Sequence, residues 1–151
     1  MKKPKVGIII GSSSDETVMS GAARQLKDFG ISYDIVIASA HRTPGKVQAF
    51  ARSAEKKYDL MIAGAGMAAH LPGVIASYTT LPVIGVPISS KALGGFDALY
   101  SIVQMPTGIP VATVAIDGAK NAAILAAEIL ALKYPYLKNK IKDFRKGLLK
   151  K

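Results

Sequence analysis

Short apolar segments alternate along the chain with longer segments of helical pattern, and this alternation constrains the fold more than any other feature. The expected strands cover residues 5–10, 33–38, 59–63, 81–86 and 110–116; the expected helices cover about residues 15–29, 44–57, 70–78, 96–103, 118–132 and the segment after Pro135. The first strand, KVGIII, is apolar throughout, as a strand buried on both faces should be. We therefore predict one α/β domain over residues 1–151, with a five-stranded parallel sheet and helices on both faces.

Cysteine is absent from the 151 residues, and only two histidines occur, His41 and His70. The lack of cysteine excludes disulfides, thiolate chemistry and cysteine-based zinc sites. Two histidines are too few for most histidine-built metal sites. We expect no metal.

The positive charge is concentrated at the carboxyl end. Residues 133–151 hold eight bases and one acid, a net charge of +7, whereas the first 132 residues hold twelve bases and nine acids, a net charge of +3. We interpret residues 134–151 as a solvated basic helix and tail beside a core of residues 5–132. Nucleic acid is not the expected partner, whereas an anionic small substrate is compatible with this charge.

No segment is expected to cross a membrane or to direct export. The first five residues, MKKPK, are basic, but the apolar run that follows is too short for a signal peptide. The most apolar stretch, residues 60–90, is interrupted by Pro72, Pro82 and Pro87. It is typical of strands in the middle of a sheet.

The turn at residues 11–15, GSSSD, follows the first strand and opens a helix. In open parallel sheets, ligands bind beyond the carboxyl ends of the strands. Free backbone N–H groups and serine hydroxyls at such a position favour an anion, and Asp15 could accept hydrogen bonds from ribose hydroxyls. An ordinary helix cap explains the same residues equally well.

The turn at residues 39–44, SAHRTP, follows the second strand. Histidine changes its protonation state near neutral pH and suits acid–base catalysis, and the adjacent Arg42 offers a forked donor for phosphate or carboxylate. The alternative is a surface loop whose histidine only packs. The position at the end of a strand favours function.

The turn at residues 64–73, GAGMAAHLPG, follows the third strand, and its small residues would let a flat ring or a phosphate approach the backbone. It matches the pattern G-x-G-x-x-A of dinucleotide-binding proteins. That reading requires an acid about twenty residues later, and none occurs between Leu60 and Phe96. The open interpretations are a tight structural turn and a site for a phosphorylated or carboxylated small molecule.

Four motifs in order resemble the 5-(carboxyamino)imidazole ribonucleotide mutases, also called the catalytic subunit of phosphoribosylaminoimidazole carboxylase. They are GSSSD (residues 11–15), SAHRTP (residues 39–44), AGAGMAAHLPG (residues 63–73) and YSIVQMP (residues 100–106). The resemblance implies a flavodoxin-like three-layer domain, a cytoplasmic homo-octamer and a ribonucleotide substrate. It also implies that no cofactor, metal or ATP is needed. Alanine-rich subunit interfaces would suit the helix near residues 122–131.

The implied reaction of purine biosynthesis moves a carboxylate from the exocyclic nitrogen of the imidazole to ring carbon four, through released carbon dioxide. By resemblance, His41 is the catalytic proton carrier. The implied substrate-binding residues are Ser12, Ser14 and Arg42 for the phosphate, Asp15 for the ribose, Ser39 and the Ala63–Gly64 backbone for the carboxylate or ring, and Ala40, His70 and Leu71 around them. For His70, ring contact and a mainly structural role both stay open.

Two departures and two alternatives accompany the resemblance. Glu16 stands where relatives have an aromatic or apolar residue, and Met67 where most have glycine; our hypothesis is that Met67 tunes affinity without changing the reaction. The related direct carboxylases have a motif closer to SAHKGP, so Arg42, Thr43 and His70 favour the mutases. A non-catalytic nucleotide-binding protein is the remaining alternative.

Overall fold

The computed structural model describes residues 3–150, so Met1, Lys2 and Lys151 of the basic termini lie outside the described residues. Five strands form one sheet: β1 (Lys5–Ile10), β2 (Ser32–Ile37), β3 (Leu60–Gly66), β4 (Val83–Ile88) and β5 (Ala112–Thr113). Their order is β2-β1-β3-β4-β5, and every neighbouring pair is parallel. This is the flavodoxin-like order, and the predicted fold class is confirmed.

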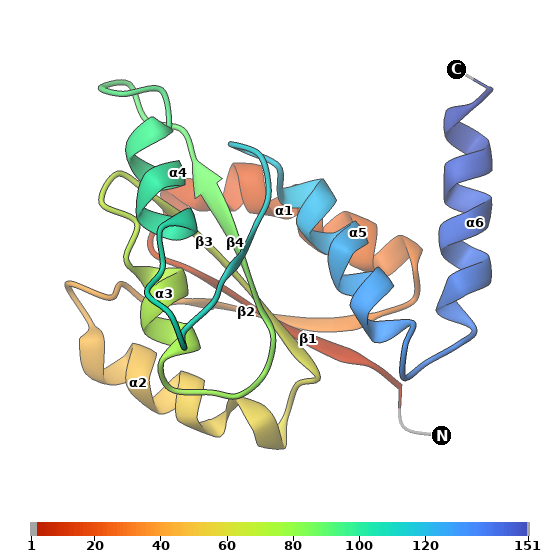
Figure 1. Cartoon of the computed structure of the whole chain (residues 1–151), viewed down its shortest axis with the longest axis horizontal. Helices are drawn as coiled ribbons and strands as arrows, with labels where there is room; N and C mark the ends of the chain where they lie inside the picture. The colour runs from red at the N-terminus through yellow and green to blue at the C-terminus, as the bar shows by residue number, and fades with distance from the viewer. Residues whose placement is uncertain (1–2, 151) are drawn as a thin grey trace.

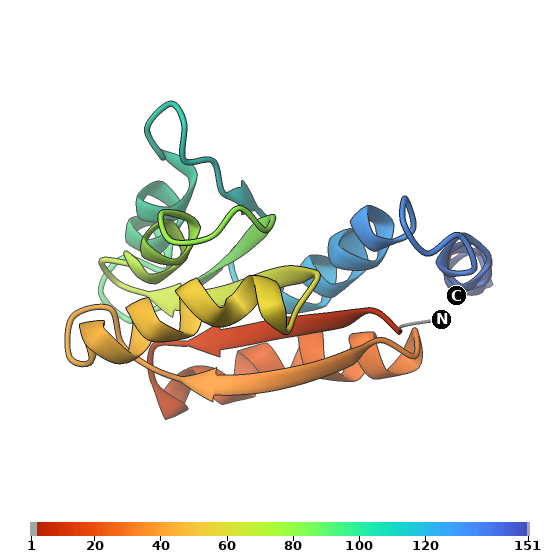
Figure 2. The same ribbon diagram turned by 90° about the horizontal axis from the view of Figure 1, so that it is seen from below.

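Helices cover both faces of this sheet (Figures 1 and 2). One face carries α1 (Glu16–Asp28) and α5 (Ala119–Leu130), and the other carries α2 (Pro44–Ser53), α3 (Leu71–Ala76) and α4 (Phe96–Val103). Short 3-10 turns, η1 (Ser13–Asp15) and η2 (Ala54–Lys56), precede α1 and follow α2. Within residues 3–150, no helix is both long and apolar enough to span a bilayer.

Successive residues of β1 point to opposite faces of the sheet. Ile8 and Ile10 belong to the core cluster under α1 and α5, whereas Ile9 belongs to the cluster under α2, α3 and α4. All three side chains are fully buried. Because both faces are covered, the strand needs apolar residues at consecutive positions.

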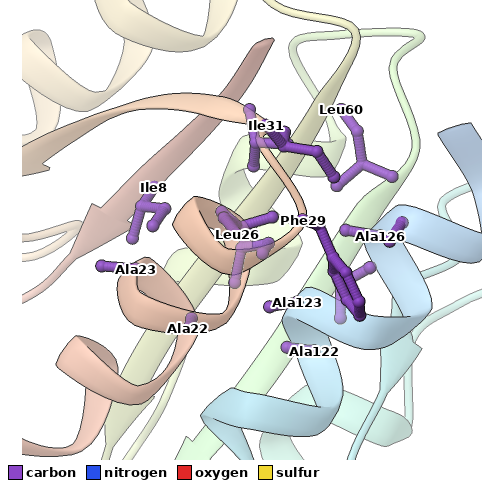
Figure 3. Close-up of a cluster of buried hydrophobic side chains, with 14 of the residues drawn as sticks. Ile8, Ala22, Ala23, Leu26, Phe29, Ile31, Leu60, Ala122, Ala123 and Ala126 are labelled. Atoms are coloured by element: carbon purple, nitrogen blue, oxygen red, sulfur yellow. The ribbon is translucent and has the colours of Figure 1, made fainter. Parts of the chain in front are cut away.

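The α1–α5 contact is built from small side chains (Figure 3). Ala22 of α1 lies opposite Ala122 and Ala123 of α5, whereas Ala23 lies on the side of α1 toward Ile8; all four alanines are buried within the chain. The alanine-rich face of α5 therefore packs inside the monomer, which corrects the expectation that it suits a subunit interface. The small residues do mark a close helix–helix contact, but the contact is between two helices of one chain.

The last helix, α6 (Leu137–Leu148), lies at the margin of the molecule beyond α5 (Figure 1). Leu137 and Ile141 are buried, and the ring of Phe144 meets that of Phe29 edge to face, with centroids 5.7 Å apart. The lysines and the arginine of this helix are largely exposed, as predicted for a solvated basic helix.

A buried carboxylate holds the segment before α6 against the start of the sheet. Asp59 accepts hydrogen bonds from the backbone N–H of Lys5, from Lys133 Nζ at 2.9 Å and from the Tyr134 hydroxyl at 3.1 Å. Burial by itself would raise the pKa of Asp59, but these hydrogen bonds outweigh it and lower the pKa.

Several element boundaries differ from the sequence-based prediction. β3 continues to Gly66 instead of ending at Ala63, and β4 continues to Ile88 instead of Val86. β5 is confined to Ala112–Thr113, since it pairs only with β4 over that stretch. Small residues and Pro87 suggested early strand ends. Pro87 is tolerated in β4 because β5 ends at Thr113, opposite Gly85, so that β4 pairs only with β3 at Pro87.

Candidate active site

The predicted turns meet at one cavity of about 630 Å³ at the carboxyl ends of β1, β2, β3 and β4. The first two turns contribute Gly11, Ser12, Ser14, Asp15, Ser39, Ala40, His41 and Arg42. The third and fourth contribute Ala65, Gly66, Met67, Ala68, His70, Leu71, Ile88, Ser89 and Ser90. Both histidines of the chain therefore share one cavity, as predicted.

In the first turn, Ser12 organises the backbone before α1. Its Oγ accepts from the Ser14 N–H at 3.3 Å and from the Ser14 hydroxyl at 3.0 Å, so its own proton is available to a ligand. Asp15 occupies the N-cap position of α1 but makes no side-chain cap hydrogen bond. The carboxylate lines the cavity. Burial raises its pKa and outweighs the lowering effect of the Ser12 backbone N–H.

In the second turn, hydrogen bonds within the loop fix the backbone that carries His41. Ser39 Oγ accepts from the N–H of Arg42 at 3.2 Å, and Thr43 Oγ1 accepts from the N–H of Ser39 at 2.9 Å. Lys46 Nζ donates to the carbonyl of Ile37 at 2.7 Å, just before the turn. The side chains of His41 and Arg42 are exposed and are not used in these contacts.

The two histidines form a direct pair. His41 Nε2 lies 2.5 Å from His70 Nδ1, and the rings meet edge to face with centroids 4.7 Å apart. One of the two nitrogens must carry the shared proton, because two unprotonated nitrogens would repel each other. Which nitrogen donates therefore depends on the tautomers of the two rings. Sequence reasoning left the role of His70 open, and the structure places its ring against that of His41.

The third turn begins later than predicted, which moves two residues out of the site. Ala63 and Gly64 are fully buried inside β3, and the carbonyl of Gly64 accepts from the N–H of Gly11. A side chain at Gly64 would meet Met19 Sδ at 2.6 Å, so this glycine serves packing. The expected ring contact is corrected: because β3 extends to Gly66, the cavity is lined by Ala65 and Gly66 instead.

Met67 stands at the mouth of the cavity in a left-handed conformation, with φ of 57° and two-thirds of its surface exposed. Few residues other than glycine adopt this conformation without strain. The backbone at Met67 keeps the conformation that suits glycine. Methionine at this position therefore strains the backbone locally without changing the conformation of the turn.

The turn after β4 was missed by sequence reasoning. Ser89 and Ser90 line the cavity, but the predicted strand ended two residues early, at Val86. The rule that ligands bind beyond strand ends would have found these serines had the end been placed at Ile88.

A second cavity, of about 690 Å³, lies at the opposite ends of the strands and has neither histidine in its wall. Its two charged side chains already have partners in the chain. Glu55 accepts hydrogen bonds from Thr79 and Thr80, and the guanidinium of Arg52 lies over the ring of Tyr78. This cavity therefore has fewer side chains available to bind or react with a ligand than the cavity that contains the histidines.

Comparison with known proteins identifies the family. The family model described as AIR carboxylase matches residues 5–151.

The chain belongs to the AIR carboxylase family.

Curated members of the AIR carboxylase family cover nearly all of this chain. The N5-carboxyaminoimidazole ribonucleotide mutase of Pyrococcus horikoshii is 61% identical over 151 residues, 99% of this chain and 85% of that protein. The mutase of Thermotoga maritima is 57% identical and covers 96% of this chain and 85% of its own. A yeast protein, the phosphoribosylaminoimidazole carboxylase of Saccharomyces cerevisiae, is 58% identical over 131 residues; these make up 86% of this chain but 23% of the yeast protein.

A solved structure of the AIR carboxylase family has the same fold. The crystal structure of Treponema denticola PurE superposes with a TM-score of 0.89 at 35% identity, covering 98% of this chain and 93% of that one. The three-layer architecture is therefore that of the family.

Proposed function

We propose that this chain is an N5-carboxyaminoimidazole ribonucleotide mutase of purine biosynthesis. It would convert 5-(carboxyamino)imidazole ribonucleotide into 4-carboxy-5-aminoimidazole ribonucleotide. Curated mutases at 57% and 61% identity over nearly the whole chain support this activity. The observation that carries the mechanism is the contact of His41 Nε2 with His70 Nδ1 inside the cavity.

The phosphate of the substrate is proposed to lie at the first turn. The Ser12 hydroxyl and the amino end of α1 supply donors there, and Arg42 adds a cation from the second turn. Ser14 lies beside the phosphate and donates to Ser12 Oγ, which leaves the Ser12 proton for the ligand. Asp15 lines the same cavity, and its carboxylate is suited to accept from the ribose hydroxyls. The ring would then extend toward the small residues at the end of β3.

The proton-handling steps are assigned to His41. The carboxylate leaves the exocyclic nitrogen as carbon dioxide, and the electron pair of the broken C–N bond stays on that nitrogen, which takes up a proton. Carbon four then attacks carbon dioxide, a C–C bond forms, and carbon four loses its proton. The two transfers balance, so a single imidazole can give one proton and recover the other.

His70 is proposed to orient the ring of His41 and to fix its tautomer. Because its Nδ1 contacts His41 Nε2, the proton between them can shift as His41 donates or accepts at the substrate. Ala40, Ala65 and Leu71 form the apolar part of the cavity wall. A bound ribonucleotide against these side chains would exclude water there and help to retain the released carbon dioxide.

A homo-octamer in the cytoplasm, without nucleic-acid or membrane partners, completes the proposal. Phe96, Tyr100 and Val103 expose about half or more of their surface on α4, which supports contact between subunits there. Measurement of the molar mass in solution would test the octamer, and a monomer would contradict it.

The test of the function is turnover of freshly prepared 5-(carboxyamino)imidazole ribonucleotide, followed by formation of the carbon-carboxylated product. The control is the His41→Asn variant, because the carbamate also decays unaided. Product from the wild type alone, without ATP or added metal, would support the mutase.

The second candidate is direct carboxylation of aminoimidazole ribonucleotide, which the 58% identity to the yeast carboxylase favours. Product from aminoimidazole ribonucleotide and bicarbonate, with none from the carbamate, would favour this reaction over the mutase. Tight binding without turnover of either substrate would leave a nucleotide-binding protein.

A further inference from the structure

The turn after β4 contains a polar group without a partner. The hydroxyl oxygen of Ser90 is buried and makes no hydrogen bond within residues 3–150, although Ser90 lines the cavity. Buried polar groups are nearly always paired, so an unpaired one beside a ligand cavity points to a partner that arrives with the ligand.

The Ser90 backbone makes a hydrogen bond within the loop before α4, whereas its side chain makes none within residues 3–150. The carbonyl of Ser90 accepts from the N–H of Gly94 at 3.0 Å. Because the Ser90 hydroxyl makes no hydrogen bond here, rotation about χ1 to another staggered position would break none.

Asp117 clamps the neighbouring residue from the loop between β5 and α5. Its two carboxylate oxygens accept from Ser89, one from the backbone N–H at 2.9 Å and the other from the hydroxyl at 2.7 Å. Its own N–H donates to the carbonyl of Pro87 at 2.8 Å. Asp117 achieves this with φ of 58°, a conformation that aspartate tolerates better than most residues.

The clamped turn borders the place proposed for the imidazole ring. A Cβ atom on Gly66 would lie 3.1 Å from the carbonyl oxygen of Ile88, so the ends of β3 and β4 are in close contact. On its other side the turn meets Gly95, where an added Cβ would lie 3.2 Å from the Cα of Ser89. The turn proposed to bind the phosphate, residues 11–15, follows β1, and β3 lies between β1 and β4. The Ser89–Ser90 turn is therefore on the far side of β3 from the proposed phosphate site.

We propose that the Ser90 hydroxyl is a binding group for the imidazole end of the ribonucleotide, and that Asp117 is a positioning residue that holds the Ser89–Ser90 turn for this contact. This proposal rests on the proposed function for the identity of the ligand. Ser90 hydrogen-bonds to the exocyclic nitrogen substituent of the ring. Ser89 does not compete for it, because its hydroxyl proton is given to Asp117.

The test compares binding of two probes, aminoimidazole ribonucleotide and ribose 5-phosphate, by titration calorimetry. The second probe has the phosphate and the sugar but no ring. Ser90→Ala should weaken the ribonucleotide about tenfold and leave ribose 5-phosphate unchanged. Ser53→Ala, at a hydroxyl that caps the end of α2 away from the cavity, is the matched control and should change neither.

Asp117 is tested by a double-mutant cycle with Ser90. Asp117→Gly suits the positive φ but removes both hydrogen bonds to Ser89. It should therefore weaken binding of the ribonucleotide and leave that of ribose 5-phosphate unchanged. In the double variant with Ser90→Ala, the affinity for the ribonucleotide should fall no further than in Ser90→Ala alone. Asp117→Asn keeps one acceptor for the Ser89 N–H and should restore part of the affinity. A purely structural role would instead give losses that add and that affect both probes.

Equal binding by wild type and Ser90→Ala, or equal weakening of both probes, would overturn the proposal. The result is independent of turnover. If the wild type binds the ribonucleotide but forms no product, the proposed function fails, while the loss in Ser90→Ala still decides the role of Ser90.

Discussion

His41 Nε2 and His70 Nδ1 lie 2.5 Å apart, although the two residues are 29 positions apart in sequence and follow different strands. The two histidines differ in how the chain holds them. His41 is carried by a loop with internal hydrogen bonds, whereas His70 is the residue before α3, and its carbonyl accepts from the N–H of Val74. In the proposed function His41 acts on the substrate, and His70 is the hydrogen-bonding partner of His41.

Replacing His41 with Asn should lower turnover by about 10²–10⁴-fold, because a proton carrier is lost while the shape of the site is kept. His70→Asn should cost about tenfold and should also change the pH profile of kcat, since the partner of His41 is altered. Steady-state kinetics across pH, with binding of aminoimidazole ribonucleotide as the control, measures both. Equal activity of His41→Asn and the wild type would refute the assignment.

Met67→Gly should stabilise the protein by about 0.5 kcal/mol, since relief of left-handed strain is offset in part by the greater freedom of glycine in the unfolded chain. Turnover should persist with a changed KM, because Met67 lies at the mouth of the cavity. Urea unfolding and kinetics of the variant provide the measurements. A variant without turnover would contradict the view that Met67 tunes affinity only.

Asp15 predicts how ligand binding changes with pH. Burial raises the pKa of this carboxyl, so protonation begins at a higher pH than for an exposed aspartate, whose ordinary value is about 3.9. Affinity for the ribonucleotide should therefore fall as the pH is lowered into that range. In Asp15→Asn this part of the pH dependence should disappear, leaving the titration of the phosphate. Identical pH profiles would remove Asp15 from the ribose site.

Asp59 makes a prediction for stability in acid. Its pKa is lowered in the folded protein, so its contribution is fully present above the unfolded value of about 3.9 and is lost as the pH falls through the folded value. Asp59→Asn should cost about 2 kcal/mol at pH 7, and the difference from wild type should shrink below about pH 4. Urea unfolding at several pH values checks this, and a difference independent of pH would contradict it.

The alternation of strands and helices, the parallel sheet and three of the four turns at the cavity could be predicted from the sequence. Strand ends could not. Ala63 and Gly64 were assigned to the site by resemblance, and the strand was predicted to end at Ala63, whereas here Gly64 makes room for Met19 inside the sheet. Ser89 and Ser90 were missed in the same way, because the strand was predicted to end before Pro87 and not at Ile88.

The contact between the histidines could not be predicted either, because it depends on geometry between turns. Sequence patterns place each histidine after its own strand, but they contain no information on ring orientation or on the distance between Nε2 and Nδ1. The role of α5 was misjudged for a similar reason: alanine spacing indicates close packing without naming the partner helix, which is α1.

The strand order has a consequence for how activity is gained during folding. β2, which precedes His41, and β3, which precedes His70, are not neighbours, because β1 lies between them and pairs with both. The histidines can meet only after three strands have come together in register, which requires contacts between distant parts of the chain and is slow compared with helix formation. Recovery of turnover after dilution from denaturant should therefore lag behind recovery of helical circular dichroism, and the active pair serves as a built-in reporter of a completed sheet centre.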